Sequence, residues 1–148
     1  MLGTLTNYEI DQILKSQTLG RIGCSAEGRT YIVPIAYAYD GEYLYGHSPE
    51  GMKIKMMRQN PKVCFEVDSM ENLANWKSVI IQGEFQELIG EPGRQAMQFF
   101  VKQLQPHLLS STSIPSQGMS HFHQTEQSEL KSVVFRIQIH EKTGRFER

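Results

Sequence analysis

The hydrophobic positions near the start of the chain follow a helical period. Residues 6–9 read as a capping box, in which the Thr6 hydroxyl accepts from the amide three residues on and Glu9 reaches back. Apolar residues then recur on one stripe, which predicts a short helix over about residues 7–16. They are Ile10, Ile13 and Leu14.

Beyond this helix most apolar positions alternate, and the alternation predicts six strands. Their expected ranges are 19–26, 30–39, 42–47, 62–68, 76–89 and 132–140. Glu27-Gly28 is a turn signal, and Asp40-Gly41 is typical of a type I′ hairpin, so the first three strands should form a meander.

Two further helices are expected over about residues 49–59 and 92–105, followed by a long loop over 106–128. Six strands with few short helices favour a mainly β fold. We expect a closed antiparallel barrel with accessory helices, because closure removes vulnerable sheet edges.

Length and composition limit the possible classes of protein. The 148 residues carry 15 Lys+Arg and 16 Asp+Glu, a net charge of −1. We expect one domain over residues 1–148, no nucleic-acid partner, and no membrane span. Cys24 and Cys64 lie in separate apolar runs and are expected to be reduced thiols without a metal, in a cytoplasmic protein.

The strand expected over 30–39 has two unequal apolar faces. One is bulky (Tyr31, Val33, Ile35, Tyr37, Tyr39) and the other mostly small (Ile32, Pro34, Ala36, Ala38). Either a helix or partner subunit packs on the small face, or a planar ligand lies there. Pro34 belongs at a sheet edge or bulge, so neighbouring backbone groups could serve a prosthetic group such as a flavin.

The segment 46–53 combines a strand end, a short loop and a helix start, an arrangement suited to an anion. Ser48 could donate from its hydroxyl and Lys53 could supply a charge, as at a phosphate site. Glu50 would repel an anion unless it points outward. The alternative is a plain solvated basic helix face.

Several runs together resemble the FMN-binding split-barrel family, in its pyridoxamine 5′-phosphate oxidase-related branch that includes nitroimidazole-resistance proteins. The resemblance covers about residues 6–146 in colinear order. The matching runs include Leu19-Gly20-Arg21-Ile22-Gly23, Tyr31-Ile32-Val33-Pro34-Ile35, Tyr45-Gly46-His47-Ser48, Gly51-Met52-Lys53, Asn60 to Asp68, Trp76 to Gly83, and Phe135-Arg136-Ile137 through Gly144-Arg145.

The resemblance implies a homodimer of six-stranded split barrels with FMN between the subunits. Backbone around Ile32, Val33, Pro34 and Ile35 would line the ring. The other implied cofactor residues are His47 and Ser48 at the ring and ribityl-phosphate side, Met52 and Lys53 at the phosphate, and Ser78 opposite.

The chain also departs from the oxidases, because their flavin-strand arginine and C-terminal arginine motif are absent. We therefore expect a flavin-dependent oxidoreductase acting on a small planar nitroaromatic- or quinone-like substrate, with His47 as the candidate catalytic residue. The alternatives are a non-catalytic module binding flavin, haem or a deazaflavin, and a structural barrel with an empty groove. His47 itself could be a hydrogen-bonded strand-end residue.

Two remaining features have a functional and a plain interpretation. His107, His121 and His123 suggest a metal, but their spacing suits no ligand set, so we expect the 106–128 loop to be a lid or a disordered stretch. Trp76, Tyr37 and Tyr45 could stack on a ring, although core or interface packing is the commoner role of such aromatics.

Overall fold

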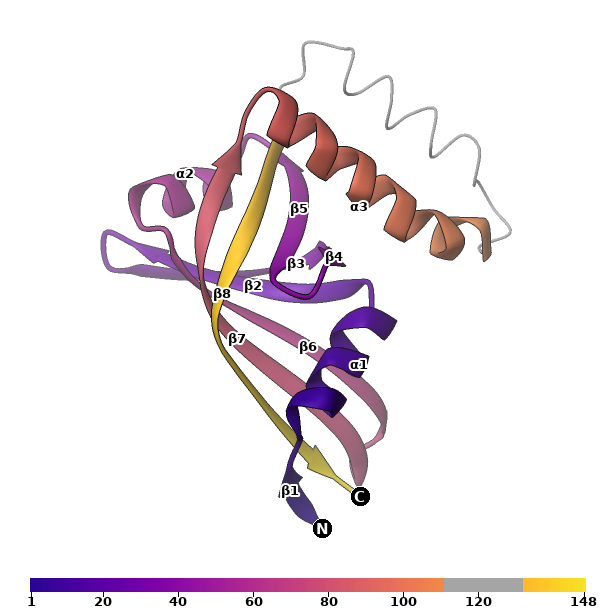
Figure 1. Ribbon diagram of the computed structural model, residues 1–148. Coiled ribbons are helices and arrows are strands. Elements are labelled where there is room, and N and C mark those ends of the chain that lie inside the picture. Colours follow the sequence, from indigo (N-terminus) through magenta and orange to yellow (C-terminus); the bar gives the residue numbers. More distant parts are fainter. Residues whose placement is uncertain (111–131) are drawn as a thin grey trace.

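The computed structural model describes residues 1–110 and 132–148, the side chains of 108–110 excepted. The described elements are β1 (Leu2–Thr4), α1 (Asn7–Ser16), β2 (Leu19–Ala26), β3 (Arg29–Ala36), β4 (Ala38–Tyr39), β5 (Tyr43–Pro49), α2 (Met52–Gln59), β6 (Lys62–Asn72), β7 (Asn75–Leu88), α3 (Glu91–Ser110) and β8 (Ser132–Glu147). Figure 1 shows the helices arranged around one strongly twisted sheet.

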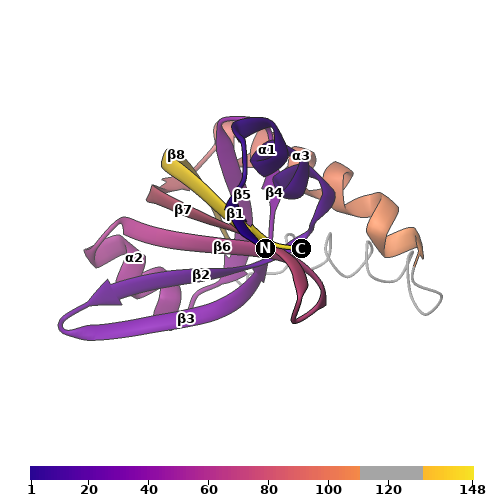
Figure 2. The same ribbon diagram turned by 90° about the horizontal axis from the view of Figure 1, so that it is seen from below.

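The described strands form one antiparallel sheet in the order β3-β2-β6-β7-β8-β5-β4, with β1 added to β8. Seen from below, the strands curl around a common interior (Figure 2). Alternate residues enter one main core, and among them Ile22, Phe65 and Phe135 are almost fully buried. The fold is therefore a mainly β split barrel, as predicted, with β1 and β4 added to the six expected strands.

The barrel is split within the run that we expected to be one strand over 30–39. This run leaves β2 at Ala36 and resumes beside β5 at Ala38, so its two halves lie at opposite ends of the sheet order. Tyr37 occupies the break, where its hydroxyl donates to the Leu14 carbonyl at 2.8 Å and its amide to the Thr18 carbonyl at 3.0 Å. The predicted three-strand meander is therefore wrong, because a core tyrosine redirects the chain.

The type I′ turn expected at Asp40-Gly41 is also wrong. A type I′ turn needs positive φ at both central residues, and here Gly41 has φ 103° whereas Asp40 is not in that region. The Asp40 carboxylate instead accepts from the amides of Glu42 and Tyr43, at 2.8 and 2.7 Å, and closes a longer loop. Positive φ at two successive residues occurs at Glu27 (52°) and Gly28 (78°).

Helices α1 and α3 begin close to where the sequence signals place them, and α2 begins later. In α1 the predicted capping box is present, because the Thr6 hydroxyl accepts from the Glu9 amide at 3.2 Å and the Glu9 carboxylate accepts from the Thr6 amide at 3.1 Å. Helix α2 begins at Met52 rather than Pro49, because Pro49 still pairs with β8. Helix α3 continues through Pro106 to Ser110, and the rest of the expected loop lies outside the described residues.

Helix α3 covers the outer side of the sheet over β4, β5 and β8 (Figure 1). Ala38, Met97 and Phe100 form a second, smaller buried cluster there. The described helices include none that is long and apolar enough to cross a membrane.

Candidate functional site

The residues predicted to line a planar ring lie on β3, an end strand of the described sheet. Its side chains alternate, so Val33 and Ile35 turn towards the core while Ile32 and Pro34 are exposed. Pro34 stands opposite Arg21 of β2, and a proline is tolerated here because one row of β3 backbone groups has no ladder partner. The edge predicted from the proline is confirmed.

The residues predicted to bind a phosphate lie where β5 leads into α2. No side chain of the described residues caps the first turn of α2, which contains no acidic residue. Lys53 is in this first turn, and none of the described residues forms an ion pair with it. Burial lowers the pKa of Lys53, an effect that the nearby Cys24 partly opposes. A desolvated ammonium beside unsatisfied helix amides favours an anion.

The edge strand and the start of α2 are in contact. The Arg29 guanidinium of β3 reaches the Met52 sulfur at 3.5 Å. The first residue of β3 therefore lies beside the cationic start of α2, and the exposed edge of β3 runs on from there to Ile32 and Pro34. Arg29 adds a second positive charge that the sequence reasoning missed.

Glu50, which could have repelled an anion, is held by Arg58. The two side chains form a bidentate pair at 2.7 and 2.9 Å, and Arg58 also binds Glu87 at 2.8 Å. The carboxylate of Glu50 is thus neutralised by a guanidinium, and its charge does not stand unopposed beside Lys53. Arg58 does not contribute a free charge to the expected basic cluster.

Ser48 and His47 lie on opposite faces of β5. The Ser48 side chain is 3% exposed, and its hydroxyl donates to the Pro49 carbonyl at 2.9 Å. His47 instead packs under α3, with its ring centre 6.3 Å from that of Phe100. Burial lowers the pKa of His47, so its imidazole is neutral at pH 7. The structure therefore does not bring His47 to the exposed edge of β3.

Ser78 lies on β7, separated from β3 by β6 and β2. Its hydroxyl donates to the Glu66 carboxylate at 3.0 Å, and Arg21 lies 3.6 Å from Glu66 and 3.2 Å from Asp68. Burial and a hydrogen bond with Asp68 raise the pKa of Glu66. From usual strand spacings Ser78 lies roughly 16 Å from Pro34 in the same chain.

The Arg21, Glu66 and Asp68 cluster was missed by the sequence analysis. The three residues alternate with buried apolar neighbours on β2 and β6. They therefore occupy the outward-facing positions of these strands. Only the pairing of β2 with β6 shows that they meet, and that register could not be read from the sequence.

The aromatic residues considered as stacking partners have other contacts. Tyr37 is in the core, and Tyr45 packs edge-on against Phe99 with ring centres 5.4 Å apart. The Tyr45 hydroxyl donates to Asp40, and burial with this bond raises the pKa of Tyr45 to about 12. These contacts agree with the packing role.

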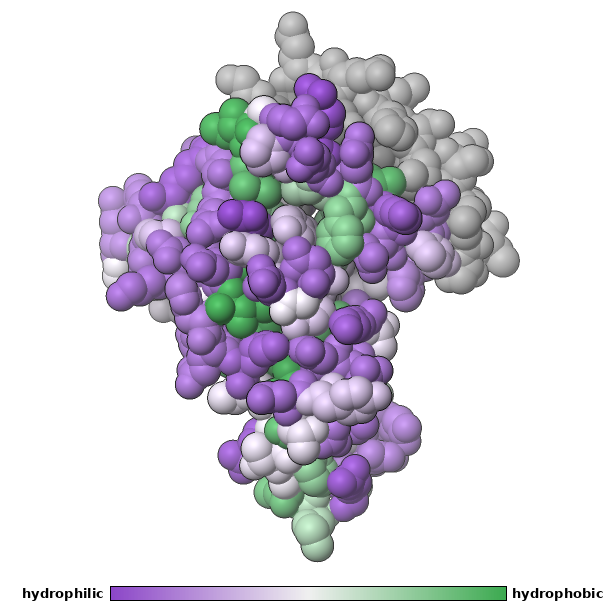
Figure 3. Space-filling view, in the orientation of Figure 1, coloured by the Kyte–Doolittle hydropathy of each residue, from purple (hydrophilic) through white to green (hydrophobic). Residues whose placement is uncertain are grey.

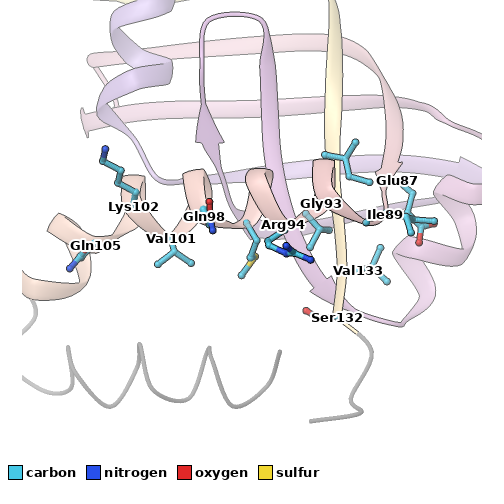
Figure 4. A pocket seen from close by; sticks show the side chains of 14 residues that line it. Glu87, Ile89, Gly93, Arg94, Gln98, Val101, Lys102, Gln105, Ser132 and Val133 are labelled. Atoms are coloured by element: carbon cyan, nitrogen blue, oxygen red, sulfur yellow. The ribbon is translucent and has the colours of Figure 1, made fainter. Parts of the chain in front are cut away.

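One open pocket lies away from the predicted residues. It measures about 810 Å³ and is lined by α3 and the ends of β7 and β8, with Arg94, Gln98, Val101 and Ser132 among its residues (Figure 4). A second groove of about 570 Å³ opens on the sheet beside Gly23, Thr30, Cys64 and Gln82, close to β3. We favour the neighbourhood of the second groove, because the cationic helix start and exposed edge lie on that side.

Cys24 and Cys64 are free thiols, as expected. In the described ranges 1–110 and 132–148 no three His, Cys, Asp or Glu side chains gather as metal ligands. His107 lies on α3, whereas His121 and His123 fall outside the described residues.

Comparison with known protein families identifies the family of this chain. The sequence model of the pyridoxamine 5′-phosphate oxidase family matches residues 6–146. An uncharacterised protein of Rhizobium meliloti is 37% identical over 89 residues, which cover 60% of this chain and 59% of that relative. The match thus spans less than two thirds of the relative's length.

Two solved structures of other proteins have folds similar to that of this chain. An FAD-binding protein of Mesorhizobium loti is 31% identical, with a TM-score of 0.78, over 100% of this chain and 98% of the other. A candidate 5-nitroimidazole antibiotic resistance protein of Bacteroides thetaiotaomicron is 19% identical, with a TM-score of 0.70, over 99% and 89% of the two chains. At that identity the second likeness shows the fold alone.

Proposed function

Because the chain belongs to the pyridoxamine 5′-phosphate oxidase family, we propose that it is a flavoprotein with the ring along β3 and the phosphate at the start of α2. One observation carries the proposal: the half-buried Lys53, without an ion pair among the described residues, lies at the uncapped start of α2. A phosphate there would satisfy both the ammonium and the helix amides.

The residues present fit a flavin, and each has a definite task. The exposed backbone edge around Ile32, Val33, Pro34 and Ile35 offers hydrogen-bonding groups to a flat heterocycle. Met52 and Lys53 hold the phosphate end, Arg29 adds charge, and the Ser48 hydroxyl fixes the loop that leads into α2. When bound, the flavin supplies hydride and electron transfer, and the protein supplies orientation and electrostatics.

The flavin is proposed to be FMN, with FAD as the rival. The resemblance of the phosphate loop to the oxidases supports FMN, whereas the Mesorhizobium loti relative is an FAD-binding protein. Absorption spectra before and after adding each flavin, with unbound ligand removed by gel filtration, test the proposal. Retained near-ultraviolet and blue bands support it, and a colourless protein that refuses both flavins contradicts it.

The activity proposed for this site is transfer of electrons to a small planar acceptor such as a nitroaromatic or a quinone. The open edge of β3 supports this activity, because the edge leaves room for a flat acceptor beside the flavin ring. His47, neutral and half-buried beside α3, is still proposed as the hydrogen-bonding or proton-supplying residue, although it does not stand at the exposed edge of β3. If His47→Ala retains the flavin and turns over at the unchanged rate, the catalytic role is wrong.

A second candidate function is a non-catalytic flavin, haem or deazaflavin carrier or sensor. The position of His47 under α3 favours it, because the one catalytic residue chosen from the sequence then does not stand at the exposed edge of β3. Reduction of the bound flavin, followed by reoxidation with a nitroaromatic or quinone, separates the two: only the enzyme reoxidises faster with the acceptor than without it. A Soret band would indicate haem.

We further propose that the protein is a homodimer. The outer face of β3, β2, β6 and β7 is the surface that supports this, because the described helices pack elsewhere. Light scattering during gel filtration gives the mass.

A further inference from the structure

A groove runs beside helix α3, away from the residues of the proposed flavin site. It is the open pocket of about 810 Å³ in Figure 4, here called the α3 groove. Helix α3 forms one wall, and the ends of β7 and β8 form the other together with the short connection from β7 to α3. A groove of this volume lies in the range of pockets that hold small organic molecules.

The α3 wall carries a stripe of polar side chains. Arg94, Gln98 and Lys102 follow one another at steps of four residues, so they lie on one side of the helix, and all three line the groove. Gln105 continues the stripe. The rise of an α-helix places Arg94 and Lys102 about 12 Å apart along the helix axis. Two cations therefore stand at two separate places along one wall.

The remaining lining is largely aliphatic. Leu88, Ile89, Val133 and Val134 contribute it from the strand side, and Met97 and Val101 from α3. Ile89 is 78% exposed, and Figure 3 shows hydrophobic surface where β7 leads into α3. No aromatic residue is among the described lining, so the groove offers no ring on which a flat molecule could stack. An aliphatic chain suits this surface better than an aromatic ring.

The charge of the groove is positive. Glu87 is the one acidic residue in the described lining, and the Arg58 guanidinium binds its carboxylate at 2.8 Å. Arg94 pairs with Glu91 at 3.0 Å, but this surface pair is weak, and the guanidinium keeps further N–H donors for a second partner. Within residues 1–110 and 132–148 no ion pair involves Lys102. Both cations can therefore receive an anion.

A buried hydroxyl lies at one end of the groove. The Ser132 Oγ atom is shielded from solvent, and none of the described residues hydrogen-bonds to it. Ser132 lines the groove where β8 begins, and Figure 4 shows Arg94 at the same end, whereas Lys102 and Gln105 lie further along α3. A serine hydroxyl turns between staggered rotamers, so it can meet an acceptor that enters the groove. A partner there would offset the cost of a buried, unpaired hydroxyl.

We propose that the α3 groove binds a linear aliphatic dicarboxylate. One carboxylate accepts from the Arg94 guanidinium and the Ser132 hydroxyl, and the other pairs with Lys102. The methylene chain between them lies along Met97 and Val101 and loses its contact with water. This ligand accounts for both cations, their separation and the aliphatic surface between them, and the site is independent of the proposed flavin site.

The length and the two charges of the ligand test the proposal, by calorimetric titration of the full chain with sebacate. The monomethyl ester of sebacate has the same chain and one charge fewer, and it should bind about fivefold more weakly. Succinate is too short to reach both cations and should bind at least about tenfold more weakly. Equal binding of sebacate and its ester overturns the proposal. Absence of sebacate binding, the result expected if residues 111–131 fill the groove instead, also overturns it.

Variants of the lining separate the two ends of the groove. Lys102→Gln should weaken the binding of sebacate about fivefold and leave the binding of its monomethyl ester unchanged, because the ester keeps its charged end at Arg94 and Ser132. Arg94→Gln and Ser132→Ala should weaken the binding of both ligands. If Lys102→Gln affects the two ligands equally, the attraction is a general one to a basic helix, and the proposal is overturned.

A matched pair of tryptophan variants tests the position of the ligand. Gln98→Trp fills the middle of the groove and should weaken sebacate binding at least about tenfold. Gln95→Trp is the control, because Gln95 is exposed on α3 and does not line the groove. Equal effects of the two variants overturn the proposal. Lys53→Ala should bind sebacate as the wild type does, so a protein that binds sebacate and no flavin contradicts the proposed function alone.

Discussion

Two parts of the outer sheet surface differ in whether a helix covers them. Over β4 and β5, helix α3 seals the surface with Met97 and Phe100, and Phe100 packs against the half-buried His47. Over β3 and β2 no described helix does so, and the surface carries Ile32 and Arg21 to the solvent. The sealed surface depends on its own helix for burial, whereas the open one remains available for a ligand and a second copy.

The largest effect should come from breaking the sealed surface. Phe100→Ala removes a side chain that is 4% exposed and should lower the free energy of unfolding by about 3 kcal/mol, because a cavity replaces the ring. Thermal unfolding should show a Tm about 10 °C lower. The control is Leu73→Ala in the exposed turn between β6 and β7, which should change stability by less than about 0.5 kcal/mol. Equal losses would show that α3 does not form a second core.

On the open surface, Lys53→Ala should change binding and spare the fold. The dissociation constant for FMN should rise roughly 10- to 100-fold, because a charge-assisted bond to phosphate is lost. The flavin-free protein should not lose stability, since burial of the Lys53 ammonium is itself unfavourable. Lys55→Ala, two residues further along α2 at an exposed position, is the control for titrations followed by flavin fluorescence. Equal weakening in both variants would argue for a diffuse basic surface.

The two surfaces should also respond to pH in opposite directions. His47 has a lowered pKa in the fold, so stability should fall as the pH drops below about 6.5, where the unfolded chain takes up the proton first. Glu66 has a raised pKa, so its contribution is full below about 4.5 and is lost as the pH rises through its folded pKa.

Unfolding curves over a pH series separate these contributions, each at most about 1.4 kcal/mol per pH unit. His47→Gln should flatten the acid-side fall, and Glu66→Gln should flatten the loss above pH 4.5 or so. A pH profile that neither substitution alters would mean that both groups titrate alike in the folded and unfolded chains.

The smallest effect should come from the surface ion-pair network. Arg58 binds Glu50 and Glu87 at exposed positions, where water and salt weaken ion pairs. Arg58→Ala should therefore lower the Tm far less than Phe100→Ala does, and the shift should shrink in about 1 M salt. Its effect on FMN affinity is the more informative readout. Removal of Arg58 takes its guanidinium away from the Glu50 carboxylate and should weaken phosphate binding.

The strands and helix starts were predictable because their signals are local. The alternation of apolar residues predicted a strand over 19–26, and the capping box predicted a helix over 7–16. The structure has β2 and α1 with these boundaries. The split at Tyr37 was not predictable, because it depends on a bond from the Tyr37 hydroxyl to the Leu14 carbonyl in α1. Strand β1 was missed because three residues are too few for a periodic signal.

The candidate site was predictable in part for the same reason. The exposed strand edge around Pro34 and the anion-suited start of α2 follow from short runs of sequence, and both are seen. The Arg21 cluster depends on strand register, and the contact of His47 with Phe100 depends on where α3 docks. Neither relation between distant segments leaves a pattern in the sequence.

Strand β8 has a consequence for how the protein folds. It pairs with β7 along most of its length and with both β5 and β1, so it joins the two halves of the barrel. Its residues, 132–147, follow all the strands with which it pairs. The barrel therefore cannot close on the ribosome until these residues have emerged, and until then β5 and β7 offer unpaired edges to other chains. Such late, long-range pairing slows folding and makes this interval the one in which aggregation or chaperone capture occurs.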